Sequence, residues 1–102
     1  MPQNFFNPIS SWGANNSVNT GSPGSAFVSL PNIPADEVTI INPGVALDIA
    51  CASTDAPGQF VTIGANSGIV INVVANAMEI QVRRNDKSAT GTNVQFIWRK
   101  YK

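Results

Sequence analysis

Two apolar runs that meet at an Asn-Pro-Gly sequence constrain this chain most. The first run is Glu37–Asn42 and the second is Val45–Ile49. In the second run the apolar residues Val45, Leu47 and Ile49 alternate with others, which is the period of a half-buried strand. Pro-Gly suits a type II turn, whose twist does not fit a tight hairpin. We therefore expect two strands joined by a longer loop, or by a corner where the chain passes between sheets.

Similar segments recur along the chain at a spacing of about ten residues, with turn residues between them. Further strands are predicted at Ala26–Leu30, Gln59–Ile63, Ile69–Val74, Met78–Arg84 and Asn93–Tyr101. No segment of helical length shows a helical period. About seven strands in this arrangement predict an all-β fold, an antiparallel β-sandwich of jelly-roll or Greek-key type.

The pattern of apolar residues also predicts which faces are buried. Ile69–Val74 is almost continuously apolar, so we expect this strand to be covered on both faces. In the next strand we expect the side chains of Met78, Ile80 and Val82 to face the core. In the last strand the corresponding residues are Val94, Phe96 and Trp98.

Residues 1–25 differ from the rest, because they contain no charged residue and are rich in Asn, Ser, Gly and Pro. Glycines and prolines interrupt the segment too often for a helix or a long strand. Three aromatic residues, Phe5, Phe6 and Trp12, are unusual for a solubilising tail. Two readings stay open: a tail whose aromatics fold back on the body, or an arm that lies on a neighbouring subunit. We divide the chain into an extended N-terminal arm, 1–25, and a β-sandwich domain, 26–102.

Composition limits the chemistry of the chain. Its 102 residues allow one domain, and 12% charged residues are about half the usual share. No histidine is present, which removes the commonest general base and zinc ligand. Cys51 stands alone, and we expect it to be a small buried side chain. The sequence predicts no enzyme, no metal or cofactor, no membrane span, no signal peptide and synthesis in a cytoplasm.

The charges divide the chain into two parts. Residues 1–82 carry five acids and no base, whereas 83–102 carry six bases and Asp86, giving −5 and +5. Three roles are open to these charges: solvated strand ends, head-to-tail contacts between identical chains, and nucleic-acid binding. Six scattered cations make a poor phosphate track, so we expect no nucleic acid as partner.

The strands resemble a known group of proteins. The residues that carry the resemblance are Ser29–Pro31, Val38–Val45, Val61–Ile63, Ile80–Ser88 and Val94–Phe96. Between about Ala26 and Arg99 the chain resembles small β-sandwich virion proteins of tailed bacteriophages, which decorate or cement the capsid or form the base of head fibres. The resemblance implies a jelly-roll-like domain, a homotrimer, the major capsid protein as partner and a place on the capsid surface.

From these observations we expect a structural virion protein that binds and stabilises the capsid exterior through its arm and sandwich edges. Phe5, Phe6 and Trp12 are predicted contacts of the arm. The predicted charged contacts are Arg83, Arg84, Arg99 and Lys100. The alternative is a tail or fibre adaptor, or a module that binds carbohydrate on a host surface.

Overall fold

A computed structural model describes residues 9–20, 26–41, 44–51, 59–88 and 90–101. The described residues form strands and one short 3₁₀ helix. In chain order they are β1 (Ile9–Asn19), β2 (Val28–Ser29), β3 (Glu37–Ile41), β4 (Leu47–Cys51), β5 (Val61–Ile63), β6 (Gly68–Asn72), η1 (Ala77–Glu79), β7 (Ile80–Arg84) and β8 (Asn93–Tyr101). The prediction of an all-β chain is confirmed.

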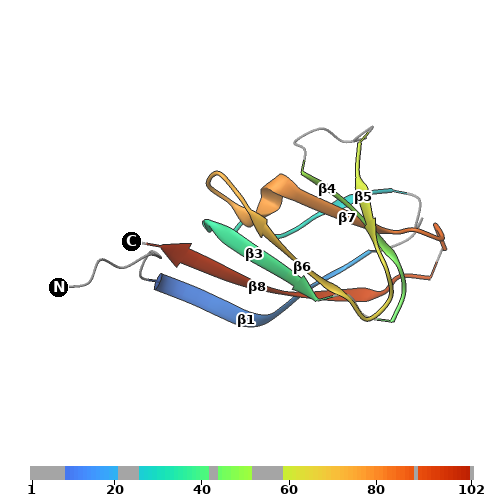
Figure 1. Cartoon of the computed structure of the whole chain (residues 1–102), viewed down its shortest axis with the longest axis horizontal. Coiled ribbons are helices and arrows are strands. Elements are labelled where there is room, and N and C mark those ends of the chain that lie inside the picture. Colours follow the sequence, from blue (N-terminus) through green and yellow to red (C-terminus); the bar gives the residue numbers. More distant parts are fainter. Residues whose placement is uncertain (1–8, 21–25, 42–43, 52–58, 89, 102) are drawn as a thin grey trace.

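The strands form two antiparallel sheets (Figure 1). Sheet 1 has the order β1-β8-β3-β6, and sheet 2 has the order β2-β7-β4-β5. Because β3 lies in sheet 1 and β4 in sheet 2, the Asn-Pro-Gly sequence joins strands of different sheets. Of the two expectations for this connection, a corner between sheets is confirmed.

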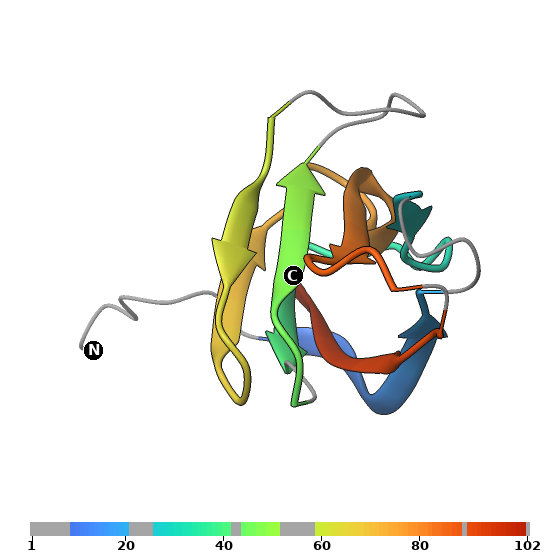
Figure 2. The ribbon, with the colours of Figure 1, turned by 90° about the vertical axis from the view of Figure 1, so that its right-hand side faces the viewer.

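The pairing is nested along the chain. The first strand pairs with the last, β2 with β7, β3 with β6 and β4 with β5, all antiparallel. Two further pairs, β3–β8 and β4–β7, lie in the middle of each sheet and join the nested pairs to one another. Viewed along the long axis, β5 and β6 lie on one side of the molecule and β1 and β2 on the other (Figure 2).

One hydrophobic core lies between the two sheets. Its strand residues are Val38, Ile40, Val94 and Phe96 from sheet 1 and Leu47, Ile49, Ile80 and Val82 from sheet 2. These residues occupy alternate positions on four strands, as the period of two predicts. Trp98 packs against this cluster from β8, so its predicted place in the core is confirmed.

Part of the expected N-terminal arm is a strand of the body. Ile9–Asn19 forms β1, which pairs with β8 along most of its length. The register shifts between Ile9 and Ser11 and between Gly13 and Asn16. These irregularities break the alternation, and the polar, glycine-containing sequence has low strand propensity, so the pattern did not show β1. This corrects the expected boundary at residue 25, while Phe5 and Phe6 lie outside the described residues.

Two predictions of burial are wrong. β6 was expected to be covered on both faces, but it is an edge strand and Val70 is 59% exposed. Met78 was expected in a strand facing the core, but it lies in η1 and is 47% exposed. Asn76 and Glu79 form a capping box that starts this 3₁₀ turn, and a local cap outweighs a weak alternation there.

A glycine of β1 sets how closely β1 approaches β8. Gly13 pairs with Trp98, and a Cβ built on Gly13 would lie 2.3 Å from Nε1 of that indole. Only a residue without a side chain leaves room for the Trp98 ring on the core side of β1. The neighbouring residue Trp12 consequently points to the outer face of sheet 1, because successive side chains alternate.

We predict that Gly13→Ala destabilises the fold by about 1–3 kcal/mol, because the added methyl group overlaps the Trp98 ring. Urea unfolding followed by far-ultraviolet circular dichroism measures the change. Gly64→Ala is the matched control, since a Cβ there meets its nearest atom at 3.8 Å. Equal stability of both variants would contradict the proposed overlap.

Candidate functional site

The predicted contact residue Trp12 lies on the outer face of sheet 1 and is 61% exposed. It pairs across strands with Arg99 of β8, which in turn pairs with Glu37 of β3. One cross-strand row therefore places an exposed indole beside Arg99, with Glu37 on the far side of the arginine. Trp12 and Arg99 were predicted as separate contacts, and the structure brings them together.

Arg99 and Lys100 are both held by acids at the start of β3. The Nη1 atom of Arg99 donates to Oε1 of Glu37 at 2.7 Å and to Oγ1 of Thr39 at 3.2 Å. The Nζ atom of Lys100 lies 3.5 Å from Oδ1 of Asp36. With Trp12, these groups make a cluster of neutral net charge, which we call the Trp12 cluster (Trp12, Asp36, Glu37, Arg99, Lys100 and Tyr101).

Tyr101 completes the Trp12 cluster. Its hydroxyl donates to Oε2 of Glu37 at 2.9 Å, and its backbone N–H donates to Oδ2 of Asp36 at 2.7 Å. The hydrogen bond to the Glu37 carboxylate raises the pKa of Tyr101, because ionisation would remove the donated proton. The carboxylates of Asp36, just before β3, and of Glu37, its first residue, are thus bound by groups at the end of β8.

The predicted contact Arg83 lies on the outer face of sheet 2, where it covers a buried acid. Its Nε atom donates to Oδ2 of Asp48 at 2.8 Å, and the Asp48 side chain is 1% exposed. The guanidinium Cζ atom lies 4.4 Å from the ring centroid of Phe27 and 4.9 Å from that of Phe60. Two aromatic rings and a carboxylate therefore surround Arg83.

Asp48 stays ionised although it is buried. Burial by itself would raise the pKa of Asp48, but hydrogen bonds from Arg83, Asn85 and Thr62, and the charge of Arg83, hold it below its ordinary value. Asn85 and Thr62 each donate to Oδ1 at 2.8 Å. Asp48 alternates with the core residues Leu47 and Ile49 and so faces outward, but nothing in the sequence identifies its partners.

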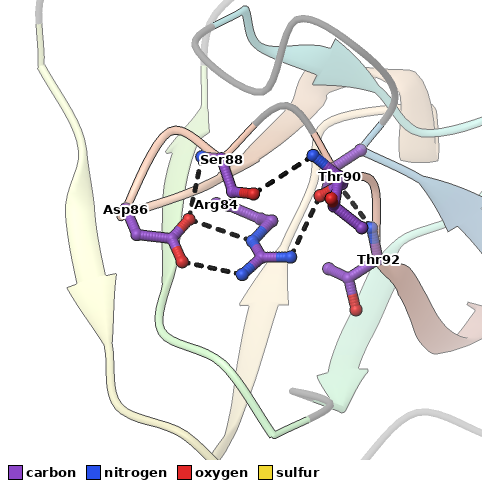
Figure 3. A network of polar contacts seen from close by, with 6 residues as sticks. Arg84, Asp86, Ser88, Thr90 and Thr92 are labelled. Atoms are coloured by element: carbon purple, nitrogen blue, oxygen red, sulfur yellow. Dashed lines mark hydrogen bonds and ion pairs between the residues drawn. The ribbon is translucent and has the colours of Figure 1, made fainter.

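Arg84, the last residue of β7, binds residues of the loop that follows this strand (Figure 3). Its Nε and Nη2 atoms donate to the two carboxylate oxygens of Asp86 at 2.9 and 2.7 Å, and Nη1 donates to the carbonyl of Thr90 at 3.0 Å. Asp86 also accepts from the backbone of Ser88, whose hydroxyl accepts from the backbone of Thr90. Arg84 consequently links Asp86 to Thr90 across this loop.

All four basic residues predicted as intermolecular contacts thus form ion pairs within the chain. Three of these pairs join the acidic part of the sequence to the basic part, and the fourth is local. The net charges of −5 on residues 1–82 and +5 on residues 83–102 therefore attract each other within one molecule. The prediction that Cys51 is buried is wrong, because Cys51 ends β4 and is exposed.

Apolar surface is exposed on the side of the molecule where β5 and β6 form the sheet edges. An open groove of about 420 Å³ lies there, beside the exposed side chains of Val61 and Phe60. The groove is lined by Ile49, Ala50, Cys51, Gln59, Phe60, Val61, Ile69 and Ile71. A groove with such an apolar lining is better suited to contact with another apolar surface than to catalysis.

Comparison of the chain with protein-family models, with curated proteins and with solved structures gives no match. In the described ranges, no three acidic or cysteine side chains gather as ligands of a metal ion would. No helix among the residues that the structure describes has the length and apolar character of a membrane span.

We predict that Asp48→Asn lowers the free energy of unfolding at neutral pH by about 3 kcal/mol, because it leaves the Arg83 guanidinium without its buried counter-charge. The folded-state pKa of Asp48 is lowered, so the stabilisation is present above the ordinary pKa of 3.8 and is lost as pH falls below about 4. The variant should therefore lose less stability than the wild type on acidification. Urea unfolding between neutral and acidic pH measures both effects.

Asp86→Asn is the matched control, since it removes an ion pair whose acid is largely exposed. It should change stability at neutral pH much less than Asp48→Asn. The lowered pKa values of Glu79 and Asp86 leave the Asp48 variant some residual acid dependence. Identical pH profiles for wild type and Asp48→Asn would contradict the assigned role of this carboxylate.

Proposed function

We propose that this chain is a structural virion protein that binds the exterior of a phage capsid and stabilises the shell, without catalysing a reaction. Its partner in this proposal is the major capsid protein, and its place is the capsid surface. The exposed Trp12 at the outer face of sheet 1 is the observation on which the proposal depends. Phe5 and Phe6, which precede β1 in the sequence, are assigned to the same contact.

We infer further that the fold is a β-sandwich of jelly-roll type. The nested pairing of eight strands, first with last and fourth with fifth, supports this inference. A jelly roll has eight strands in two sheets and occurs in viral capsid and lectin domains. Because one fold carries many functions, the topology is consistent with the proposal but does not select it.

The properties of Trp12 suit a protein contact. A tryptophan buries a large apolar area when it is covered, and tryptophans are enriched among the residues that dominate interface energies. Its charged neighbours Arg99 and Glu37 neutralise each other, so covering the cluster does not bury an isolated charge. Many copies on one shell make a modest single contact sufficient, because engagement is multivalent.

We predict that Trp12→Ala weakens binding to capsids by about 2 kcal/mol, or about thirtyfold in affinity. The probe is the capsid of the virus that encodes the chain, prepared without it, and co-sedimentation measures the bound fraction. Met78→Ala is the control, since Met78 is also about half exposed but lies in η1. Equal binding of both variants would show that Trp12 is not part of the contact. Failure of the wild-type chain to bind the capsids would refute the proposed structural function.

Carbohydrate binding is a second candidate that one observation favours. Sugars stack their apolar faces on exposed aromatic rings, and their hydroxyl groups both donate and accept hydrogen bonds. The Trp12 cluster offers an exposed indole beside Arg99, whose guanidinium binds the carboxylate of Glu37 on the next strand. A lectin-like role on a host surface would use the same face of sheet 1.

A glycan array probed with the full wild-type chain separates the two functions. The carbohydrate reading predicts glycan signals that Trp12→Ala abolishes and Met78→Ala keeps, since only Trp12 offers a stacking surface beside polar groups. The capsid proposal predicts that the array stays silent while capsids retain the chain.

A further inference from the structure

We propose that the edge of β6 is a contact between two copies of this chain, which pair antiparallel through Gly68–Asn72. This strand is the outer strand of sheet 1, and Val70 at its centre is 59% exposed. The proposed dimer differs from the homotrimer that the resemblance implies, and its test in solution needs no capsid. The two proposals can therefore fail separately.

The sequence of β6 does not match its position in the sheet. Apart from Asn72, Ile69–Val74 has the β-branched pattern of a strand that is covered on both faces, yet the described residues of the chain leave it at an edge. Exposed edge strands are normally protected by lysines, prolines or bulges. Gly68–Asn72 contains no charge and no proline, and its pairing with β3 is regular. Such an edge is suited to pairing with another strand.

The other three sheet edges are less suited to such pairing. β1 at the opposite edge of sheet 1 has two register shifts and polar side chains. In sheet 2, β2 has two residues and β5 has three, which is too short for a long edge-to-edge ladder. Only β6 among these edges combines five regular residues with an apolar, uncharged sequence.

The lack of charge in β5 and β6 identifies the occupant as a second copy of the chain. A two-fold contact places each residue near its own counterpart, so every charge in it meets the same charge. The chain contains no charged residue between Asp55 and Glu79, a segment that includes β5 and β6. The side of the molecule formed by these strands can therefore meet itself without like-charge repulsion.

The geometry of such a pair also accounts for the groove. A two-fold axis at Val70 places the two Val70 side chains beside each other on the outer face, and it places Ile69 opposite Ile71 of the second copy. Ile69 and Ile71 line the open groove together with Ile49 and Val61. Pairing of the edges would narrow this apolar opening and bury part of its lining, which favours association.

Sedimentation of the full chain in reducing buffer tests the inference. At about 100 µM, where micromolar contacts are filled, we expect a species of twice the 10.8 kDa chain mass. Val70→Lys should weaken the association at least about tenfold, because it places two ammonium groups side by side. Val70→Thr should keep it, since threonine retains the β-branched shape without a charge.

Two further variants keep the result interpretable. Ser17→Lys introduces the same charge at an exposed position on the opposite edge strand β1 and should leave the dimer intact. In a Cys51→Ser background, Val70→Cys should form a disulfide between two chains on oxidation, because residues facing each other across an antiparallel pair are close enough for one. Circular dichroism checks that every variant folds.

A monomeric wild type, a trimer, or a dimer that Val70→Lys leaves unchanged would each overturn the proposed contact. A dimer that dissociates equally with Ser17→Lys and Val70→Lys would overturn it as well, since the effect would not belong to the β6 edge. Loss of the dimer in Val70→Lys alone, with the disulfide formed in Val70→Cys, would support it.

Discussion

The pairing between β3 and β8 and between β4 and β7 is the interaction on which the rest of the structure depends. These two pairs join strands far apart in the sequence, and each lies in the middle of its sheet. Each also carries an ion pair in direct register: Glu37 faces Arg99, and Asp48 faces Arg83. A slip by one residue would turn the core residues outward and at the same time separate these charges. Hydrophobic pattern and charge thus specify one register.

This arrangement explains why the charges are divided along the sequence. Three acids of residues 36–48 pair with three bases of the last two strands, Asp48 with Arg83, Glu37 with Arg99 and Asp36 with Lys100, so the division of charge partly reflects topology. The strand order, β1 with β8 through β4 with β5, requires contacts of long sequence separation, whose loop-closure cost slows folding. Opposite charges on the strands that must meet favour the correct encounter and disfavour alternatives that place like charges together.

The sequence predicted the elements that alternate regularly and missed those that do not. β4, β7 and β8 show a period of two, and their core residues were found, whereas β3 was predicted as a strand without its core residues. β1 was missed because its bulges and its Asn-, Ser- and Gly-rich sequence hide it, although β8 supplies a ladder for it to join. The Trp12 cluster could not be predicted, because Trp12 enters it through β1. The capping box of Asn76 and Glu79 was visible in the sequence, and it would have corrected the place of Met78.

The distribution of charge gives the molecule two kinds of surface with different consequences. The ends of β8 and β7 carry paired charges, which satisfy each other and fix the register. The strands β5 and β6 carry none, and a net charge of zero leaves the chain little general repulsion to keep copies apart. An uncovered β-branched edge is a hazard under these conditions, because any strand with free backbone groups can add to it. A specific partner for that edge therefore protects the folded chain as well as assembling it.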